Sequence, residues 1–319
     1  MTNQTRPLVS IVTPSFNQAA FLPATLDSVL SQDYESLELI VMDGGSTDGS
    51  VAILEAIDDP RLTWISERDR GQSHALNKGM ARAQGEILTY LNSDDLLIPH
   101  TVAFIVDYFE AHPEIDLLFG DCAYIDDTGH TFKVARGIPF NLRDALIASP
   151  PAMFQQGAFW RRRVYDHIGG FDESLHYTMD SEYWVRAGIM GCQFAYVPGV
   201  RGAFRFHGES KTVSQAPAFW RDWRAAIDKL YSLPELPPEA LAWRQESLDY
   251  HAWHDAKMAW VEKDYATARP MLRRFLRGKK WVRRALAAPM LVDSYLGTPF
   301  TRLLTGSYKR LRGVDLFAP

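Results

Sequence analysis

Short apolar runs alternate with helix-forming segments over the first 112 residues of the chain. The runs are of strand length and occupy residues 8–14, 37–43, 62–66 and 87–92. A helical pattern follows each of them, over residues 23–32, 51–57, 73–84 and 99–112. Strands that are apolar along nearly their whole length and alternate with helices are typical of parallel sheets covered on both faces. The pattern therefore predicts an α/β fold with a Rossmann-like, doubly wound sheet.

The pattern becomes mixed after residue 120. Residues 122–134, CAYIDDTGHTFKV, predict a β-hairpin that turns at Asp127-Thr128-Gly129, because Asp and Gly favour tight turns. Four further elements are expected: a strand over 154–160, a helix over 180–191, and two short strands over 194–198 and 202–207. The second half of the sheet is therefore expected to be mixed rather than strictly parallel.

Strand signals disappear from about residue 213. Six large apolar residues fall on one helical face at the 3.6-residue period: Phe219, Trp220, Trp223, Ile227, Leu230 and Tyr231. A proline-rich stretch at 233–238 separates this helix from helical patterns near 239–262 and 264–277. We expect an α/β domain over residues 1–212 and an α-helical C-terminal extension over residues 213–319.

The composition is that of a soluble globular protein, with 46% hydrophobic and 23% charged residues among 319. The N-terminal segment lacks the apolar core of a signal peptide, and no stretch approaches the about 20 apolar residues of a membrane-spanning helix. Cys122 and Cys192 have neither metal-binding nor redox spacing, so we expect buried free thiols in a reducing compartment. The expected location is the cytoplasm.

Positive charge is concentrated at the C-terminal end. From Pro270 onward there are 11 basic and 2 acidic residues, a net charge of +9, which leaves −14 for the first 269 residues of the total of −5. Residues 270–312 would suit a peripheral contact with the inner membrane face, with Phe275, Leu276 and Trp281 as anchors. Alternatively, these helices pack against the α/β domain or a second subunit, as in a homodimer. No nucleic-acid partner is expected.

The fourth apolar run stops in four polar residues, Asn92-Ser93-Asp94-Asp95. Open α/β sheets bind their ligands at the carboxyl ends of the strands. Two adjacent carboxylates suit a hard divalent cation such as Mg²⁺ or Mn²⁺, which shares its other positions with phosphate oxygens. The alternative is a solvated loop start without a ligand, because acidic residues are common there.

The other strand ends also carry candidate ligand-binding residues. Pro14 and Phe16 follow the first run, and Asp43 ends the second run, ahead of Gly-Gly-Ser-Thr-Asp-Gly. This stretch is neither the G-x-G-x-x-G dinucleotide pattern nor a P-loop. Arg70 and Lys78 could meet a pyrophosphate, and the alternative is that both are solvated surface cations.

Five segments in chain order resemble the blocks of the family 2 glycosyltransferases. They read TPSFNQ, VMDGGSTDGS, DRGQSHALNKGMARAQGEILTYLNSDD, FDESLHYTMDSEYWVRAG and FRFHGESKT. The resemblance covers residues 7–212 and is greatest to bacterial enzymes that build surface polysaccharides. It implies the GT-A fold, a mixed Rossmann-like sheet that binds nucleoside diphosphate sugars.

The resemblance also implies a donor pocket. Pro14 and Phe16 would line the nucleotide pocket, and Asp43 would bond the base. Arg70 and Asn77, in the third block, are expected to contact the donor. A UDP-sugar is the first expectation for that donor, although the motifs fix neither the base nor the sugar.

The metal and the catalytic base are implied by the remaining blocks. The acidic tetrad matches the family's metal-binding D-x-D region, with Asp94 as the ligand and Asp95 beside it as a donor contact. His207 matches a position that helps bind the metal and diphosphate, and Asp180 matches the catalytic base. Asn92 departs from the family, since many relatives have Asp there. Its amide can contact a ribose hydroxyl, but it weakens the negative charge of the site.

The reaction implied is metal-dependent, inverting transfer of a sugar to a hydroxyl of a glycan or lipid-linked acceptor, with Mn²⁺ or Mg²⁺ as cofactor. Gln155, Gln156 and Trp160 are further candidates for acceptor contacts, although their strand could equally belong to the core. Two alternatives remain. A nucleotidyltransferase would share the sheet, but the turn TPSFNQAAF lacks the Gly and cations of its phosphate loop. A non-catalytic nucleotide-sugar-binding protein would keep the pocket and lose the base.

Overall fold

The computed structural model describes residues 6–148, 152–208, 216–277 and 281–296. The chain divides into two compact units. The first contains Met1–Ala145 and Pro150–Pro237, and the second contains Leu146–Ser149 and Pro238–Pro319. The first unit reaches Pro237, whereas the sequence places the start of the helical extension at residue 213.

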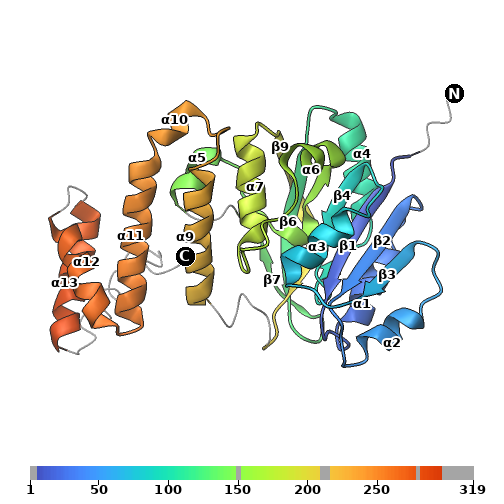
Figure 1. Cartoon of the computed structure of the whole chain (residues 1–319), viewed down its shortest axis with the longest axis horizontal. Helices are drawn as coiled ribbons and strands as arrows, with labels where there is room; N and C mark the ends of the chain where they lie inside the picture. The colour runs from blue at the N-terminus through green and yellow to red at the C-terminus, as the bar shows by residue number, and fades with distance from the viewer. Residues whose placement is uncertain (1–5, 149–151, 209–215, 278–280, 297–319) are drawn as a thin grey trace. The chain divides into compact units, whose positions relative to one another are not determined.

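Four parallel strands form one half of the sheet in the first unit. They are β1 (Val9–Ser15), β2 (Leu37–Asp43), β3 (Leu62–Ser66) and β4 (Ile87–Tyr90). Their order in space is β3-β2-β1-β4, and Val9 of β1 pairs with Leu37 on one side and Ile87 on the other (Figure 1). The reversal of strand order at β1 is that of a doubly wound sheet, so the prediction for this half is confirmed.

Helices cover both faces of this half. Helices α1 (Leu22–Leu30) and α4 (Thr101–Ala111) share a buried cluster with Ile11. The next residue, Val12, points to the opposite face and meets α3 (Gln72–Met80), since side chains alternate along a strand. Helix α3 lies so close that a Cβ added at Gly79 would sit 2.3 Å from Val12 Cγ1, so only glycine fits there. The short helix α2 (Ser50–Glu55) follows β2.

The other half of the sheet is mixed, as expected. Its strands are β5 (Leu96–Leu97), β6 (Leu117–Ile125), β7 (Thr131–Ala135), β8 (Phe159–Arg161) and β9 (Phe194–Arg205). The order continues from β4 through β8, β6, β9 and β5, and β7 pairs with β6 as the predicted hairpin. Strand β8 is antiparallel to both neighbours, and β9 is parallel to β6. The helical elements of this half are α5 (Leu142–Ile147), η1 (Gln155–Gly157), α6 (Arg162–Ile168), α7 (Met179–Ile189) and α9 (Ala216–Leu230).

Strand β9 corrects one prediction, because it is continuous where the sequence predicts two short strands. The break was expected near Pro198, which has no N–H to donate to a neighbouring strand. Asp121 of β6 restores the pairing at this point. Its carboxylate accepts hydrogen bonds from the Gly199 N–H at 2.9 Å and the Tyr196 hydroxyl at 2.7 Å. The register between β6 and β9 shifts on either side of Asp121, so the proline is accommodated without ending the strand.

The second unit is helical, with α10 (Pro238–Leu241), α11 (Arg244–Val261), α12 (Tyr265–Leu276) and α13 (Trp281–Leu296). Its core contains Trp253, Leu272 and Phe275, and the rings of Trp253 and Phe275 meet edge to face at 5.1 Å. Phe275 is 7% exposed, so the expectation that it anchors the protein in a membrane is wrong. The side chain of Trp281 and residues 297–312 lie outside the described part of the chain.

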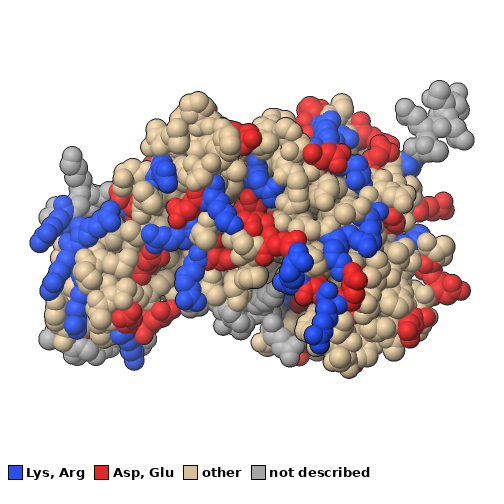
Figure 2. All heavy atoms as spheres, viewed as in Figure 1, with Lys and Arg blue, Asp and Glu red and all other residues tan. Residues whose placement is uncertain are grey.

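Lys and Arg side chains gather over α12 and α13 (Figure 2). Some of these cations interact within the unit. The Arg269 guanidinium lies 4.2 Å from the centre of the Tyr295 ring, and Arg283 donates to the Asp249 carbonyl oxygen at 2.9 Å. None of the helices in the described residues is both long enough and apolar enough to span a bilayer.

Candidate active site

A cleft of about 530 Å³ opens at the carboxyl ends of β1 and β4 in the first unit. The loop after β1 and the beginning of α3 form one part of its wall. Residues 153–156, the segment before α7, and Phe219 of α9 form another part. The cleft therefore lies at the edge where open α/β sheets bind ligands.

The structure brings five of the ten residues predicted for the donor, metal and base sites to this cleft, and the acceptor-contact candidates Gln155 and Gln156 line it as well. The five that line it are Pro14, Phe16, Asn92, Asp94 and Asp180. The other five predicted residues are not part of the cleft wall, and they are Asp43, Arg70, Asn77, Asp95 and His207. Phe16 is 58% exposed, which is unusual for a phenylalanine and leaves its ring available to a ligand.

Asp43 is buried beneath the loop that follows β2. Its carboxylate accepts hydrogen bonds from the N–H groups of Gly45 and Ser46 at 3.0 and 2.9 Å, and from the hydroxyls of Ser46 and Ser66 at 2.5 and 2.6 Å. These four bonds use both carboxylate oxygens. In this structure Asp43 therefore shapes the loop beside the cleft, and its contact with a base stays a prediction.

Arg70 and Asn77 both contact the segment that precedes α7. The Arg70 side chain is 69% exposed and forms an ion pair with Glu173 at 2.6 Å. The Asn77 side chain donates to the Phe171 carbonyl oxygen at 2.9 Å and accepts from the Phe171 N–H at 2.8 Å. Asn77 therefore ties α3 to this segment, and its predicted contact with the donor finds no support in the geometry.

The two adjacent carboxylates of the acidic tetrad point in different directions. Asp94 lines the cleft, and its Oδ2 lies 2.9 Å from Nε2 of His207. Asp95 is fully buried behind it and accepts hydrogen bonds from the Arg205 N–H at 3.0 Å and from three side-chain amides, those of Asn92, Gln155 and Gln156, at 3.2, 3.0 and 2.9 Å. Burial, followed by the charge of Asp94, raises the pKa of Asp95 well above its usual value.

These contacts predict that two neighbouring substitutions differ in how much they lower stability. Asp95→Ala should lower the free energy of unfolding by about 3 kcal/mol, because four donors lose their acceptor in a buried site. Asp94→Ala should change it by less than about 1 kcal/mol, because Asp94 borders the cleft and its removal also relieves the repulsion with Asp95. Urea-induced unfolding of both variants measures the difference. Equal losses would contradict the separation of roles.

Several residues of the site were not predicted from the sequence. The Arg205 guanidinium donates to the Asp94 carbonyl oxygen at 2.8 Å and is 3% exposed. Gln72 donates to Oδ1 of Asn92 at 2.6 Å and lines the cleft. Arg205 lies two positions before His207, in the block FRFHGESKT. This position in the block is the sequence signal that could have identified it. Trp160 is completely buried, which makes the expectation of an acceptor contact there wrong.

Asp180 reaches the cleft from the first turn of α7. Its Oδ1 accepts the Ser181 N–H at 2.7 Å, and burial raises the pKa of its carboxyl. Glu182, also in the first turn, points elsewhere and forms an ion pair with Arg186 at 2.7 Å, with side chains 6% and 14% exposed. Asp180 is thus the carboxylate of this helix that can meet a substrate.

A mixed Rossmann-like sheet with an aspartate-bearing cleft at its strand ends is the arrangement expected of the GT-A fold. The chain belongs to glycosyl transferase family 2, whose model matches residues 10–169. It is 34% identical over 186 residues to an uncharacterised glycosyltransferase of Mycobacterium tuberculosis, covering 58% of this chain and 70% of that protein. It is 25% identical over 211 residues to the chondroitin synthase of Escherichia coli, covering 66% and 30%.

Solved structures confirm the fold. S. aureus TarS residues 1–349, in complex with UDP-GlcNAc, superposes with a TM-score of 0.63 at 17% identity, covering 97% of this chain and 93% of that one. The mannosyltransferase PcManGT of Pyrobaculum calidifontis, in complex with GDP-Man and Mn²⁺, gives a TM-score of 0.60 at 22% identity, covering 98% and 89%. The GT-A fold expected from the sequence motifs is therefore correct.

Proposed function

We propose that this protein transfers a sugar from a nucleoside diphosphate sugar to an acceptor hydroxyl with inversion at the anomeric carbon. The observation that carries the proposal is the placement of Asp94 and Asp180 in one cleft at the ligand-binding edge of a GT-A sheet. The membership in family 2 favours transfer over the nucleotidyltransferase alternative. UDP- and GDP-sugars are both candidate donors, because the two solved neighbours were obtained with UDP-GlcNAc and GDP-Man.

A divalent cation, Mn²⁺ or Mg²⁺, is proposed to bind at Asp94 and His207. Among the described residues no group of three or more His, Cys, Asp or Glu side chains converges on one point. Two protein ligands are enough for a cation that takes its other ligands from the donor's phosphates and water. Asp95 cannot serve as one of them in the observed geometry, because its oxygens are bound to four donors. When bound, the cation would offset the charge that develops on the departing diphosphate.

Asp180 is proposed to be the general base. It would accept the proton of the acceptor hydroxyl while that oxygen attacks the anomeric carbon from the face opposite the leaving group. Two further polar groups of the cleft wall are available to hold hydroxyl groups of a substrate. Oγ of Ser15 and Oε1 of Gln155 are buried, and neither has a hydrogen-bond partner in the described structure.

A screen of nucleotide sugars tests the proposal. Purified protein with Mn²⁺ should show a higher unfolding temperature with one donor or a small group of donors, because a ligand at 100 times its dissociation constant stabilises by about 2.7 kcal/mol. The same donors with a chelator provide the control, and should give a smaller shift. Absence of stabilisation by every UDP-, GDP-, TDP- and CDP-sugar would contradict the proposal.

The acceptor is proposed to be a glycan or a lipid-linked glycan, which would place the enzyme at the inner membrane face. The burial of Phe275 leaves electrostatics as the support for membrane contact, through exposed cations such as Arg273 and Arg277. Each cation near an anionic bilayer contributes about 1 kcal/mol. The full-length protein should therefore sediment with anionic vesicles at low salt and be released as salt is raised. If the protein does not sediment with the vesicles at low salt, membrane contact is contradicted. The alternative, in which these helices pack against the α/β domain or a second subunit, would then be favoured.

A further inference from the structure

The family model matches residues 10–169, so the segment that leads into α7, α7 itself and α9 all lie beyond it. Helix α9 contacts this segment. This segment, residues 171–178, borders the cleft with His176 and Tyr177, and α9 itself contributes Phe219 to the cleft wall. Asp180 follows the segment by two residues. The position of the proposed base therefore depends on how residues 171–178 are held.

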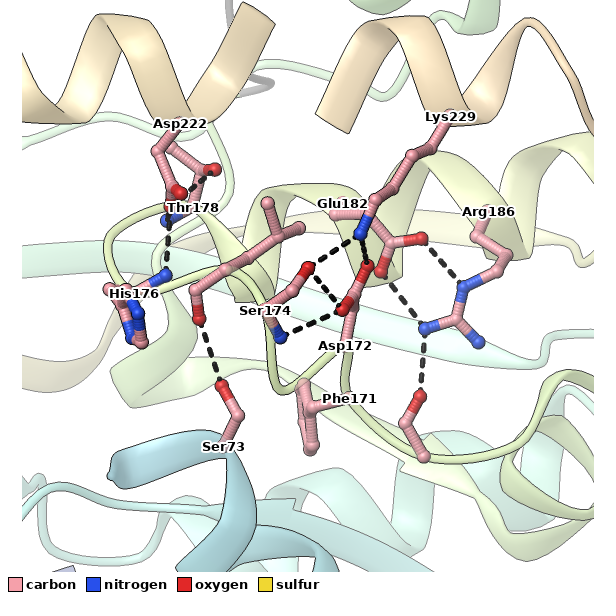
Figure 3. Close-up of polar contacts among 12 residues, drawn as sticks. Ser73, Phe171, Asp172, Ser174, His176, Thr178, Glu182, Arg186, Asp222 and Lys229 are labelled. Carbon is pink, nitrogen blue, oxygen red and sulfur yellow. Dashed lines mark hydrogen bonds and ion pairs between the residues drawn. The ribbon is translucent and has the colours of Figure 1, made fainter. Parts of the chain in front are cut away.

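Asp222 of α9 binds the end of this segment. One oxygen of its carboxylate, Oδ2, accepts the consecutive N–H groups of His176, Tyr177 and Thr178 at 3.0, 2.7 and 3.0 Å, and also the Thr178 hydroxyl at 3.2 Å. Figure 3 shows Asp222 beside His176 and Thr178. Consecutive N–H groups that converge on one point form an anion-binding concavity, which the Asp222 carboxylate fills. The side chain of Thr178, the N-cap residue of α7, makes no capping bond. Asp222 adds a negative group at this helix N-terminus, beside Asp180 and Glu182 of the first turn.

Besides the contacts of Arg70 and Asn77 described above, Lys229 and Ser73 hold the same segment in place. Lys229 of α9 donates to Oδ2 of Asp172 at 2.6 Å and to the Ser174 hydroxyl at 2.5 Å. From the side of α3, the Ser73 hydroxyl donates to the Leu175 carbonyl oxygen at 3.2 Å (Figure 3). The segment is therefore bound between α3 and α9, and Asp222 holds its last three residues, 176–178.

We infer that Asp222 is a positioning residue for the catalytic base: it fixes the start of α7 so that Asp180 projects into the cleft toward the acceptor hydroxyl. This inference rests on the proposed function of Asp180. It extends the functional part of the chain from α7 to α9, and both helices lie beyond the residues that the family model matches. Asp222 does not line the cleft, so it would act through the backbone of residues 176–178 and not on the substrate.

Substitution of Asp222 should reduce turnover while donor binding is preserved. Asp222→Asn keeps the shape and one carbonyl oxygen but loses the charge, and we expect kcat to fall about tenfold. Asp222→Ala also loses the carboxylate oxygen that accepts these hydrogen bonds, and we expect kcat to fall by about 10²-fold. Small misplacements of a catalytic group have effects of this size. The dissociation constant of the donor should change less than threefold. Asp228→Asn, an exposed aspartate on the same helix, is the matched control and should behave as wild type.

A double-variant cycle with Asp180→Asn separates positioning from general stabilisation. Once the base is removed its position no longer matters, so Asp222→Asn should add less than a twofold loss in the Asp180→Asn background. A tenfold further loss there, or a lowered unfolding temperature with normal kcat in Asp222→Asn alone, would overturn the inference. If Asp222→Ala does not fold, Asp222→Asn carries the test. Wild-type turnover by Asp180→Asn alone would instead show that the proposed base is wrong.

Discussion

Asp180→Asn is expected to reduce sugar transfer by about 10²-fold or more, because the variant keeps the shape of the side chain and loses the base. Donor affinity should stay within about threefold of wild type, since the proposed metal ligands Asp94 and His207 are unchanged. Initial rates at saturating donor and acceptor provide the measurement. Asp166→Asn, which alters an exposed residue of α6, is the control. Transfer by Asp180→Asn at the wild-type rate would contradict the assignment.

The pH dependence of the wild-type enzyme gives a second view of this residue. Burial raises the pKa of Asp180 above the usual value of 3.8. The base is active when ionised, so kcat/KM should fall as the pH drops through this raised pKa.

The effect of the raised pKa of Asp180 on the stability of the fold has the opposite sign. A native pKa above the unfolded one contributes stability at low pH that is lost as the pH rises through the native pKa. Asp180→Asn should therefore be no less stable than wild type at pH 7.

Asp94→Ala is expected to remove the metal-dependent part of nucleoside diphosphate binding. Loss of one charged partner in such a site costs about 2–5 kcal/mol, so affinity measured with Mn²⁺ should fall by about 10²-fold or more. Calorimetric titration with and without Mn²⁺ measures the two components separately. Asp58→Ala, which alters an exposed aspartate ahead of β3, is the control. It should retain both the metal-dependent and the metal-independent parts of binding. Unchanged Mn²⁺-dependent affinity in Asp94→Ala would show that the metal, if used, binds elsewhere.

The parallel half of the sheet could be predicted because its signals are local. Strands β1, β2 and β4 are buried on both faces and therefore apolar along nearly their whole length, whereas the edge strand β3 is partly exposed. Strands β2 and β3 begin and end at the residues predicted. Elements that depend on distant contacts were missed. Strand β5 has only two residues, Leu96 and Leu97, and exists because it pairs with β9. The continuity of β9 through Pro198 depends on a carboxylate contributed by β6.

In the candidate site, too, local features could be predicted and features that depend on distant contacts could not. Motifs in the sequence identified the segments that meet at the cleft, but they could not tell which way each side chain points. Asp94 and Asp95 are identical neighbours in the sequence, and only the packing of η1 and β9 buries one and leaves the other at the cleft. Asn77 is a second residue whose side-chain direction the motif could not predict. It lies in a family block, but the approach of the segment after α6 occupies its amide.

The stereochemistry of transfer tests the central claim most directly. The donor selected by thermal stabilisation would be incubated with Mn²⁺, the protein and an acceptor glycan, and the product examined by proton NMR at the anomeric position. The account predicts release of the nucleoside diphosphate, a product with the anomeric configuration opposite to that of the donor, and loss of both with Asp180→Asn. A product that retains the donor's configuration, or equal product formation by Asp180→Asn, would contradict it.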